Sequence, residues 1–263
     1  MIRATNRFDA RHLAEFQRTP YVPQAPFNPQ SPAQWARSTL GLERPSLKAM
    51  PLDREQVRAV CRTSDDVLDG YLTVMAWGMQ GVGKTKSKAV VAWRDGQARI
   101  VKNLCMLRDG KLTRAEAFEL FSNINPIAQL GPSYFTKLIH FYAPDGPSGV
   151  DRYIMDTWTG KSINLLTREH IVRIQGTSAT PENKPENFEA FCAEVDALRD
   201  LENSRRADRQ LQGEQIERML FCSGAQRGQL RGAWRAYVHA NWEECRPKHR
   251  YEHRAICART ASS

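Results

Sequence analysis

The chain has 263 residues, of which 41% are hydrophobic and 25% are charged, values that are ordinary for a folded globular protein and exclude a low-complexity chain. Lys and Arg outnumber Asp and Glu by 38 to 29, and the net charge of +9 favours a polyanionic partner such as nucleic acid. The sequence contains no apolar run long enough to span a membrane and no apolar N-terminal stretch that would act as a secretory signal. We therefore expect a cytoplasmic protein without a membrane partner.

The first fifty residues are expected to form an extended, proline-rich arm. Residues 21–35, YVPQAPFNPQSPAQW, contain four prolines, which oppose regular structure. Helical patterning begins near Leu52, and a second helix is expected to begin at Ser64. We therefore divide the chain into an N-terminal arm, residues 1–50, and a helical domain, residues 51–263.

Residues 78–85 read GMQGVGKT and match the phosphate-binding loop G-x-x-x-x-G-K-[ST] of nucleotide hydrolases. A working loop of this kind follows a strand of a parallel sheet and precedes a helix. Only residues 71–77, YLTVMAW, would supply that strand, and the chain lacks the alternation of strands and helices that a parallel sheet requires. A nucleotide hydrolase that uses Gly78–Thr85 stays open as an alternative function.

The rest of the chain reads as mostly helical. Residues 84–112 fit either a helix or a short hairpin around Asp95 and Gly96. Thr113 and Glu116 form a capping box that opens a helix, and Pro132 fits the first turn of the next one. Further helical segments are expected over residues 154–166, 186–201, 213–224 and 229–242. These patterns predict an all-α fold.

Residues 130–166 carry the most informative pattern. They contain GPSYFTK, which ends at Lys137, and MDTWTGKS, whose Asp156 follows Lys137 by nineteen residues. These motifs resemble the helix-hairpin-helix DNA glycosylases, in particular the 8-oxoguanine DNA glycosylase branch, and look most like a compact prokaryotic group with that fold. In that branch a lysine of the hairpin helix is the nucleophile, and an aspartate follows at the same separation. The resemblance implies Lys137 and Asp156 as catalytic residues and double-stranded DNA, with a flipped modified purine, as the substrate.

The implied reaction explains why an amine and a carboxylate are needed. A bifunctional glycosylase uses a neutral amine to attack the sugar C1′ and displace the base, and the resulting Schiff base permits strand nicking by β-elimination. A lysine becomes neutral only when it is desolvated or lies near other cations. Asp156 is expected to stabilise the positive charge on the sugar and to assist proton transfer. On residue type alone, Lys137 fits an exposed helical lysine and Asp156 fits an N-cap residue.

Other side chains are expected to hold the extruded base or the DNA backbone. Phe141 lies one helical turn beyond Lys137, where the resemblance implies a base contact and a core Phe is the alternative. The hairpin keeps only Gly131 of the two glycines usual in the family, so Ser133 is expected to help hold a phosphate. The expected base-pocket residues are Phe141, Gly78, Gln80, Trp77 and Trp234. The expected DNA contacts are Ser133, Trp158, Lys161, Lys84, Arg227 and Arg231.

The cysteines do not indicate a metal centre. Six are scattered through the chain, and the stripe Cys245, His249, His253 and Cys257 spans too much of a helix for one metal ion. We expect no metal, no cofactor and a monomer. Besides the hydrolase, two alternatives stay open: a non-catalytic DNA-binding module in defence or damage signalling, and a monofunctional glycosylase that activates water through Asp156.

Overall fold

The computed structural model describes residues 7–19, 30–78, 86–144, 151–176, 178–205, 210–221 and 232–242. Helices dominate these residues, and the prediction of a mostly helical protein is therefore confirmed. The strands among them are β1 (Ile174–Gln175) and β2 (Ser178–Ala179), which form a two-stranded antiparallel sheet.

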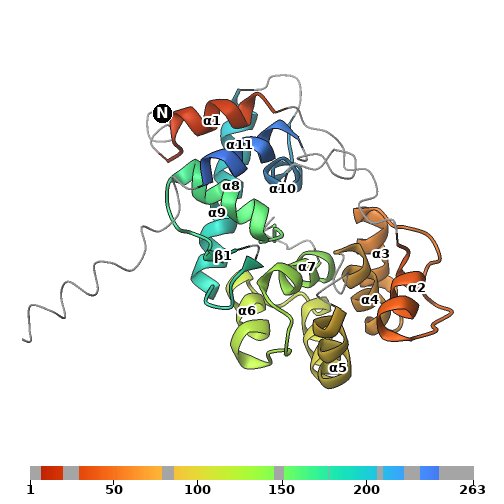
Figure 1. The fold of residues 1–263 in the computed structure, drawn as a ribbon. Helices are drawn as coiled ribbons and strands as arrows, with labels where there is room; N and C mark the ends of the chain where they lie inside the picture. The colour runs from red at the N-terminus through yellow and green to blue at the C-terminus, as the bar shows by residue number, and fades with distance from the viewer. Residues whose placement is uncertain are drawn as a thin grey trace, which may run out of the picture.

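The helices lie in two groups (Figure 1). The first helix group contains α2 (Pro32–Trp35), η1 (Ala36–Leu40), α3 (Arg54–Thr63), α4 (Val67–Trp77), α5 (Lys86–Arg108), α6 (Arg114–Glu119), η3 (Leu120–Ile124) and α7 (Pro132–Tyr142). Helix α7 packs on α3, α4, α5 and α6, and in Figure 1 it lies on the side that faces the other group.

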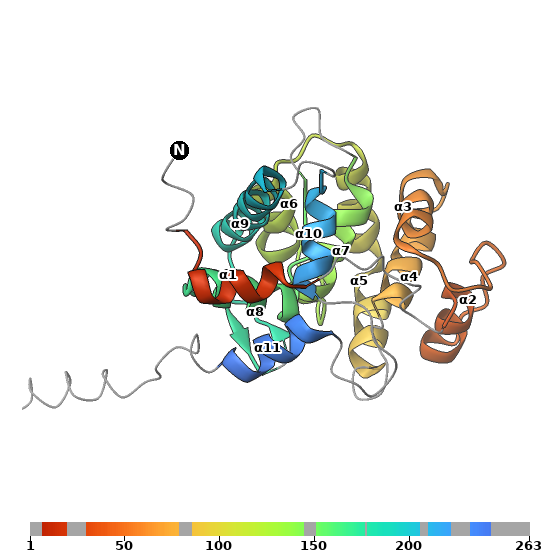
Figure 2. The same cartoon turned by 90° about the horizontal axis from the view of Figure 1, so that it is seen from above.

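The second helix group contains α1 (Ala10–Gln17), α8 (Thr157–Thr167), α9 (Pro185–Ser204), α10 (Gly213–Phe221) and α11 (Ala233–Asn241). Helix α1 packs on α8 and α11, so the beginning of the chain joins its later helices (Figure 2). Helix α6 packs on α9, and α7 packs on β2, and these contacts join the two groups.

Two helices at the centre explain where a site can form. Helix α4 is apolar nearly all round, and every one of its residues except Leu68 is buried, as expected for a helix inside the core. In α7 all residues from Phe135 to Tyr142 are buried, and three of them are polar: Thr136, Lys137 and His140. Because buried polar groups need hydrogen-bond partners, these three side chains must contact polar groups of neighbouring elements.

The expectation that residues 1–50 are loop-like is wrong for two segments. Helix α1 begins after Asp9, whose carboxylate caps the first turn, and Phe16 is fully buried. Helix α2 begins after Ser31, which caps it, and Pro32 occupies the first turn, where a proline is compatible with a helix. The number of prolines alone did not show that Pro32 stands where a helix can begin. The division into an arm and a domain stays a prediction.

The ambiguous stretch after the glycine-rich motif is one helix, α5, of 23 residues. The hairpin alternative around Asp95 and Gly96 is therefore wrong. Gly96 is in the helix for a packing reason, since a Cβ atom there would lie 2.8 Å from Cγ2 of Ile127. A glycine can mark a close contact as well as a turn.

The structural context of a nucleotide hydrolase is missing from the described residues. Residues 71–77, the expected strand, belong to α4, and the described sheet is a single antiparallel pair. A phosphate-binding loop depends on a preceding strand in a parallel sheet. Residues 79–85 themselves lie outside the described residues. The match at Gly78–Thr85 therefore lacks the element that would precede it.

Several predicted helix boundaries are confirmed. Thr113 and Glu116 form the expected capping box of α6, and Pro132 is at the first position of α7. The helix expected over residues 186–201 is α9. These boundaries were predictable because capping residues satisfy the free amides of the first turn through short-range contacts.

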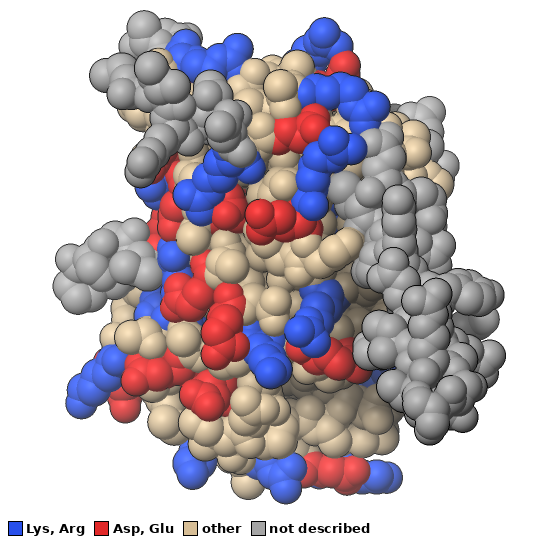
Figure 3. All heavy atoms as spheres, turned by 90° about the vertical axis from the view of Figure 1, so that its left-hand side faces the viewer, with Lys and Arg blue, Asp and Glu red and all other residues tan. Residues whose placement is uncertain are grey.

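The net positive charge is not concentrated on the face that carries α1 and α9. Figure 3 shows that Lys and Arg are interspersed with Asp and Glu on this face. Several of these charges are paired, for example Arg7 with Glu194 at 2.6 Å. A polyanion would meet both signs of charge here, so this face is a poor candidate for a DNA-binding surface.

Candidate active site

The hairpin before α7 gives the site its first wall. Helices α6 and η3 end at Ile124, and a connection of seven residues leads to Pro132, the first residue of α7. Gln129 in this connection has φ of 65°, in the left-handed region that favours glycine. The connection turns the chain into α7, whose second turn carries Thr136 and Lys137.

Asp156 is the N-cap of α8. Its Oδ1 atom accepts hydrogen bonds from the backbone amides of Trp158 at 2.8 Å and Thr159 at 3.0 Å. Thr159 completes a capping box by accepting from the backbone amide of Asp156 at 2.9 Å. Among the contacts of described residues, the carboxylate is held through Oδ1, and no partner is recorded for Oδ2. The cap therefore fixes the carboxylate and leaves one of its oxygens for another role.

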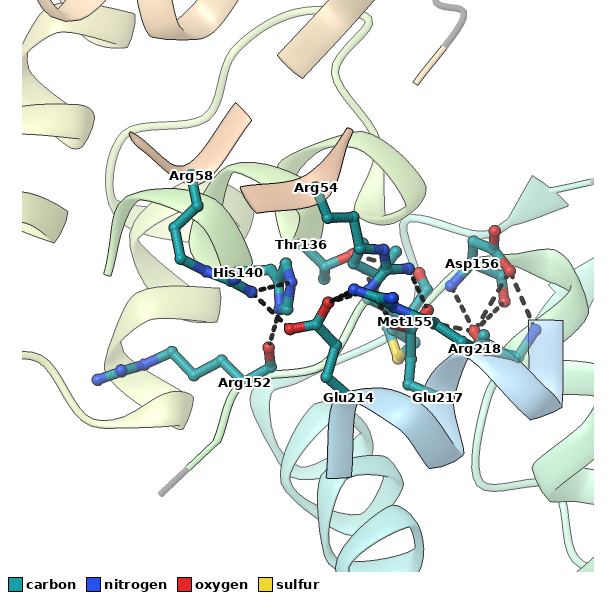
Figure 4. Close-up of polar contacts among 12 residues, drawn as sticks. Arg54, Arg58, Thr136, His140, Arg152, Met155, Asp156, Glu214, Glu217 and Arg218 are labelled. Carbon is teal, nitrogen blue, oxygen red and sulfur yellow. Dashed lines mark hydrogen bonds and ion pairs between the residues drawn. The ribbon is translucent and has the colours of Figure 1, made fainter. Parts of the chain in front are cut away.

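The segments that carry Lys137 and Asp156 are joined by the residues that directly precede these two. The backbone amide of Met155 donates to the hydroxyl of Thr136 at 3.2 Å, and this hydroxyl lies 2.7 Å from the carbonyl of Pro132 in its own helix (Figure 4). The Thr136 side chain of α7 is therefore hydrogen-bonded to the backbone segment that leads into α8. The nineteen-residue spacing read in the sequence becomes a direct contact between the two segments.

Lys137 is buried, with 8% of its surface exposed. Its Nζ atom donates to the carbonyl of Ser133 and lies 5.4 Å from the centre of the Tyr134 ring. Burial lowers the pKa of Lys137, the carboxylates of Asp156 and Glu217 oppose this change, and the cation of Arg54 adds to it. Burial also raises the pKa of Tyr134, with a further contribution from the charge of Asp156. The amine and the Asp156 carboxylate therefore share one electrostatic environment.

Gly78 lies beside the stem of Lys137, and Trp77 directly precedes Gly78. A Cβ atom at Gly78 would approach Cδ of Lys137 to 3.1 Å, so the glycine makes room for the lysine stem. The ring of Trp77 packs edge-on against Phe141, with centroids 5.1 Å apart. Phe141 is fully buried, and Trp77 is 7% exposed. Both aromatic rings belong to the core wall behind Lys137 in this structure.

A network of buried charges lies next to the site (Figure 4). Arg54 of α3 forms two hydrogen bonds with Glu217 of α10, of 2.5 and 3.1 Å. Arg58, one turn later in α3, binds Glu214 at 2.6 Å and donates to His140 at 3.2 Å. The sequence analysis did not identify these residues, because periodicity does not show which charged side chains of a helix turn inward.

His140 is neutral in this network. Its Nδ1 atom donates to the carbonyl of Arg152 at 2.6 Å, and its Nε2 atom accepts from Arg58, which fixes the tautomer. Burial lowers the pKa of His140 to about 3; the nearby Arg54 and Arg58 act in the same direction, and Glu214 opposes it. A cation on α7 beyond Lys137 is therefore disfavoured by the surroundings.

Two cavities border α7 without Lys137 in their walls. One, of about 200 Å³, lies at the hairpin and is lined in part by Phe121, Ile127 and Phe135. The other, of about 260 Å³, lies towards the end of α7 and includes His140 and Arg152. Lys137 lies between them along the helix. Neither of these two cavities reaches the Lys137 amine.

Alternating cations and rings form a second feature, on α8, α10 and α11. The guanidinium carbon of Arg235 is 3.9 Å from the Trp158 ring centre and 5.1 Å from that of Phe221. Nζ of Lys161 is 5.3 Å from Trp158 and 4.9 Å from Trp242. All five side chains are partly exposed, and we call them the aromatic–cation ladder. Trp158 and Lys161 were predicted DNA contacts, whereas Phe221 and Trp242 were not among them.

The remaining predicted site residues either have a buried polar group or lie outside the described part of the chain. Trp234 was expected in the base pocket, but it is 1% exposed, stacks on Tyr237 and donates to the hydroxyl of Ser162 at 3.0 Å. It is a core residue with no face open to a base, because its polar atom is already paired inside the second helix group. The Ser133 hydroxyl is buried without a hydrogen-bond partner. Four predicted residues lie outside the described part of the chain: Gln80, Lys84, Arg227 and Arg231.

The described residues include no group of three or more His, Cys, Asp or Glu arranged to hold a metal ion. The stripe from Cys245 to Cys257 lies outside them. A search for membrane spans among the described helices found none that is both long and apolar enough.

Comparison with known proteins gives one match. The family model described as "Putative 8-oxoguanine DNA glycosylase OGG-like protein" matches residues 19–221, more than three quarters of the chain. The matched range contains Lys137, Asp156 and the whole first helix group. No curated protein and no solved structure matches the chain.

Proposed function

Because this chain belongs to the 8-oxoguanine DNA glycosylase OGG-like family, we propose that it excises an oxidised or otherwise modified purine from DNA, with Lys137 as the nucleophile. The observation that carries this proposal is the contact between α7 and the start of α8. The Thr136 and Met155 hydrogen bond joins the helix that carries the buried amine to the residue before the fixed carboxylate. An amine and a carboxylate are the two groups that a bifunctional glycosylase needs.

Lys137 attacks as a neutral amine. Its nitrogen forms a bond to C1′ of the sugar, the glycosidic bond breaks, and the base leaves with the bonding electron pair. Loss of a proton from nitrogen and opening of the sugar ring then give the Schiff base, from which β-elimination breaks the 3′ phosphodiester bond. Burial supports this role because it lowers the pKa of Lys137 and increases the neutral fraction at a given pH.

Asp156 stabilises the positive charge that develops on the sugar. Its Oδ1 atom is bound to the first amides of α8, and Oδ2 is the atom that would face the substrate. A carboxylate held in this way does not need to reorganise during the reaction, which strengthens its effect on the transition state. The Asp156 carboxylate acts electrostatically on the Lys137 amine, which supports a role for it in accepting the amine's proton.

DNA binding and base extrusion complete the proposal. The segment from α6 to α7 acts as a helix-hairpin-helix that meets the backbone near Ser133, whose hydroxyl must rotate to reach a phosphate. The carbonyl of Gly78 and the rings of Trp77 and Phe141 border the base once the side chains around Lys137 open. The predicted contacts of Gln80, Lys84, Arg227 and Arg231 belong to the same model.

The ladder supplies the second DNA contact of this proposal. Trp158 and Lys161 follow Asp156 directly on α8, so a strand that delivers a sugar to Asp156 passes over them. Aromatic rings stack on unpaired bases, and the cations attract phosphates.

Borohydride trapping tests the function directly. Wild-type protein is incubated with duplexes that carry 8-oxoguanine, other modified purines or undamaged guanine, and borohydride reduces any Schiff base to a stable protein–DNA adduct. We expect an adduct with one modified purine, and peptide mapping that assigns it to Lys137. A variant with Lys111→Gln is the matched control, because it removes an exposed lysine to which no DNA contact is assigned.

The other outcomes identify the alternatives. Release of a base without an adduct indicates a monofunctional enzyme that activates water through Asp156. Binding without release of any base indicates a DNA-binding module. An adduct that maps to a lysine other than Lys137 contradicts the proposed nucleophile.

A further inference from the structure

The Arg54–Glu217 pair is the most buried charge pair beside the candidate site. The side chains of Arg54 and Glu217 are 4% and 1% exposed. Figure 4 shows them pointing towards each other from α3 and α10, and they form hydrogen bonds of 2.5 and 3.1 Å. Such two-bond pairing fixes the orientation of both groups. The pair therefore holds a carboxylate in one defined place.

This pair borders the wall behind Lys137. The guanidinium carbon of Arg54 lies 5.3 Å from the centre of the Trp77 ring. Trp77 is followed by Gly78, which contacts the stem of Lys137. Both members of the pair act electrostatically on the amine, Glu217 favouring the ammonium form and Arg54 disfavouring it. The pair and the candidate nucleophile are thus neighbours in space and in charge.

The charges around Lys137 come from three elements. Asp156 of α8 and Glu217 of α10 both stabilise an ammonium, and Arg54 of α3 opposes them. On α7 itself the nearest ring is that of Tyr134. Two carboxylates beside one buried lysine would hold its proton firmly, which is the wrong state for a nucleophile. One carboxylate is needed for the sugar, so the other must be neutralised by a different cation.

We propose that Arg54 is a positioning residue: by holding Glu217 in a two-bond pair, it keeps that carboxylate from pairing with Lys137 and leaves the amine free to react. The inference rests on the proposed role of Lys137 as the nucleophile. It assigns to Arg54 of α3 and Glu217 of α10, two side chains without a proposed substrate contact, control over the charge of the reacting amine.

The test compares pH profiles of base release under single-turnover conditions for three variants. Arg54→Met leaves Glu217 with Lys137 as its near cation, so the rising limb of the profile moves to higher pH and the rate at pH 7 falls roughly threefold to tenfold. Glu217→Gln removes a carboxylate that holds the proton, so the limb moves to lower pH. The double variant, with both charges removed, returns the limb towards its wild-type position.

The opposite signs are the decisive readout. A pair that only stabilises the fold would lower the rate for both single variants without moving either limb, and that result overturns the proposal. So does a shift in the same direction for both. If Arg54→Met does not fold, Glu217→Gln alone decides, because the proposal requires its limb to move to lower pH.

Two controls separate this proposal from the function itself. Arg58→Met removes another arginine of α3 that pairs with an acid of α10, and its limb should stay in place because Arg58 pairs with Glu214 and not with Glu217. Wild-type protein that releases no base contradicts the proposed function. Wild-type protein that releases base, with unshifted profiles in the Arg54 and Glu217 variants, contradicts only the positioning role.

Discussion

Lys137 and Lys161 have the same local arrangement on consecutive helices, and only their surroundings differ. Each follows an aromatic residue by three positions, and its Nζ atom lies over that ring, 5.4 Å from Tyr134 and 5.3 Å from Trp158. Lys137 is buried among charges of α3, α8 and α10, whereas Lys161 is partly exposed and shares the ladder with Trp242. The same short-range motif thus gives a candidate nucleophile in one place and a candidate phosphate contact in the other.

Exchange of each lysine for glutamine is the strongest way to break this comparison. Lys137→Gln removes the nucleophile, so we expect single-turnover base release to fall on the order of 10⁴-fold or more, with DNA binding retained. Lys161→Gln should have the opposite effect. The rate of the chemical step should be retained, and the slope of binding affinity against salt concentration should fall by the amount that corresponds to about one phosphate contact. Filter binding at several salt concentrations, together with single-turnover rates, checks both. Equal losses of rate in the two variants would remove the distinction between them.

Asp156→Asn tests whether the carboxylate that accompanies only Lys137 has a chemical role. Asparagine caps helices as well as aspartate, so the start of α8 and the thermal midpoint should be preserved. The loss of the negative charge should lower the rate of base release by about 10² to 10⁴-fold. Calorimetry and single-turnover kinetics separate the two roles. A variant with a normal rate would show that Asp156 is a cap and nothing more.

Gly78→Ala asks whether the position of Lys137 matters as well as its charge. The added Cβ atom would lie 3.1 Å from Cδ of Lys137 and 3.2 Å from the carbonyl of Val74, so the lysine stem must shift by a few tenths of an ångström. Gly78 has φ of −77°, which alanine adopts easily, so stability should change by less than about 1 kcal/mol. We expect about a tenfold loss of rate. An unchanged rate, measured with an unchanged midpoint, would show that the stem tolerates the displacement.

The smallest effect concerns the pH dependence of stability on the buried side of the comparison. The pKa of His140 is lowered from 6.5 to about 3 in the folded protein, so between these values the unfolded chain binds a proton that the folded protein does not. Stability should therefore fall as pH decreases below about 6.5, by at most about 1.4 kcal/mol per pH unit from this group. His140→Gln should flatten that part of the curve in urea unfolding experiments. An equal slope of stability against pH in the wild-type protein and the variant would show that the folded protein does not keep His140 unprotonated.

The sequence predicted what depends on short-range patterns. Capping at Thr113 and Asp156, the proline at the start of α7 and the spacing of Lys137 and Asp156 are all set within a few residues, or within two adjacent helices. Their side chains could be assigned before any coordinates were known, because each satisfies backbone groups that every helix start leaves free.

Contacts between residues far apart in the chain could not be predicted from the sequence. Arg54 and Glu217 are 163 positions apart, and in the sequence each is one of several charged residues on an amphipathic helix. Trp234 was assigned to a base pocket near Arg231, an expected DNA contact, but its ring packs against Phe16, whose helix α1 lies in a region predicted to be an extended arm. Periodicity shows which face of a helix is apolar and not which distant segment covers it.

The docking of α1 against α11 constrains how the protein is made. His12 and Tyr237 are bonded at 2.9 Å, and Phe16 packs edge-on against Trp234, although more than two hundred positions separate these residues. On the ribosome, α1 is synthesised before α11, and more than two hundred further residues must be made before its partner emerges. In a nascent chain that lacks α11, the faces of α1 and α8 that α11 covers are exposed, so the second helix group completes its folding last. A premature stop codon before Trp234 would leave these faces exposed.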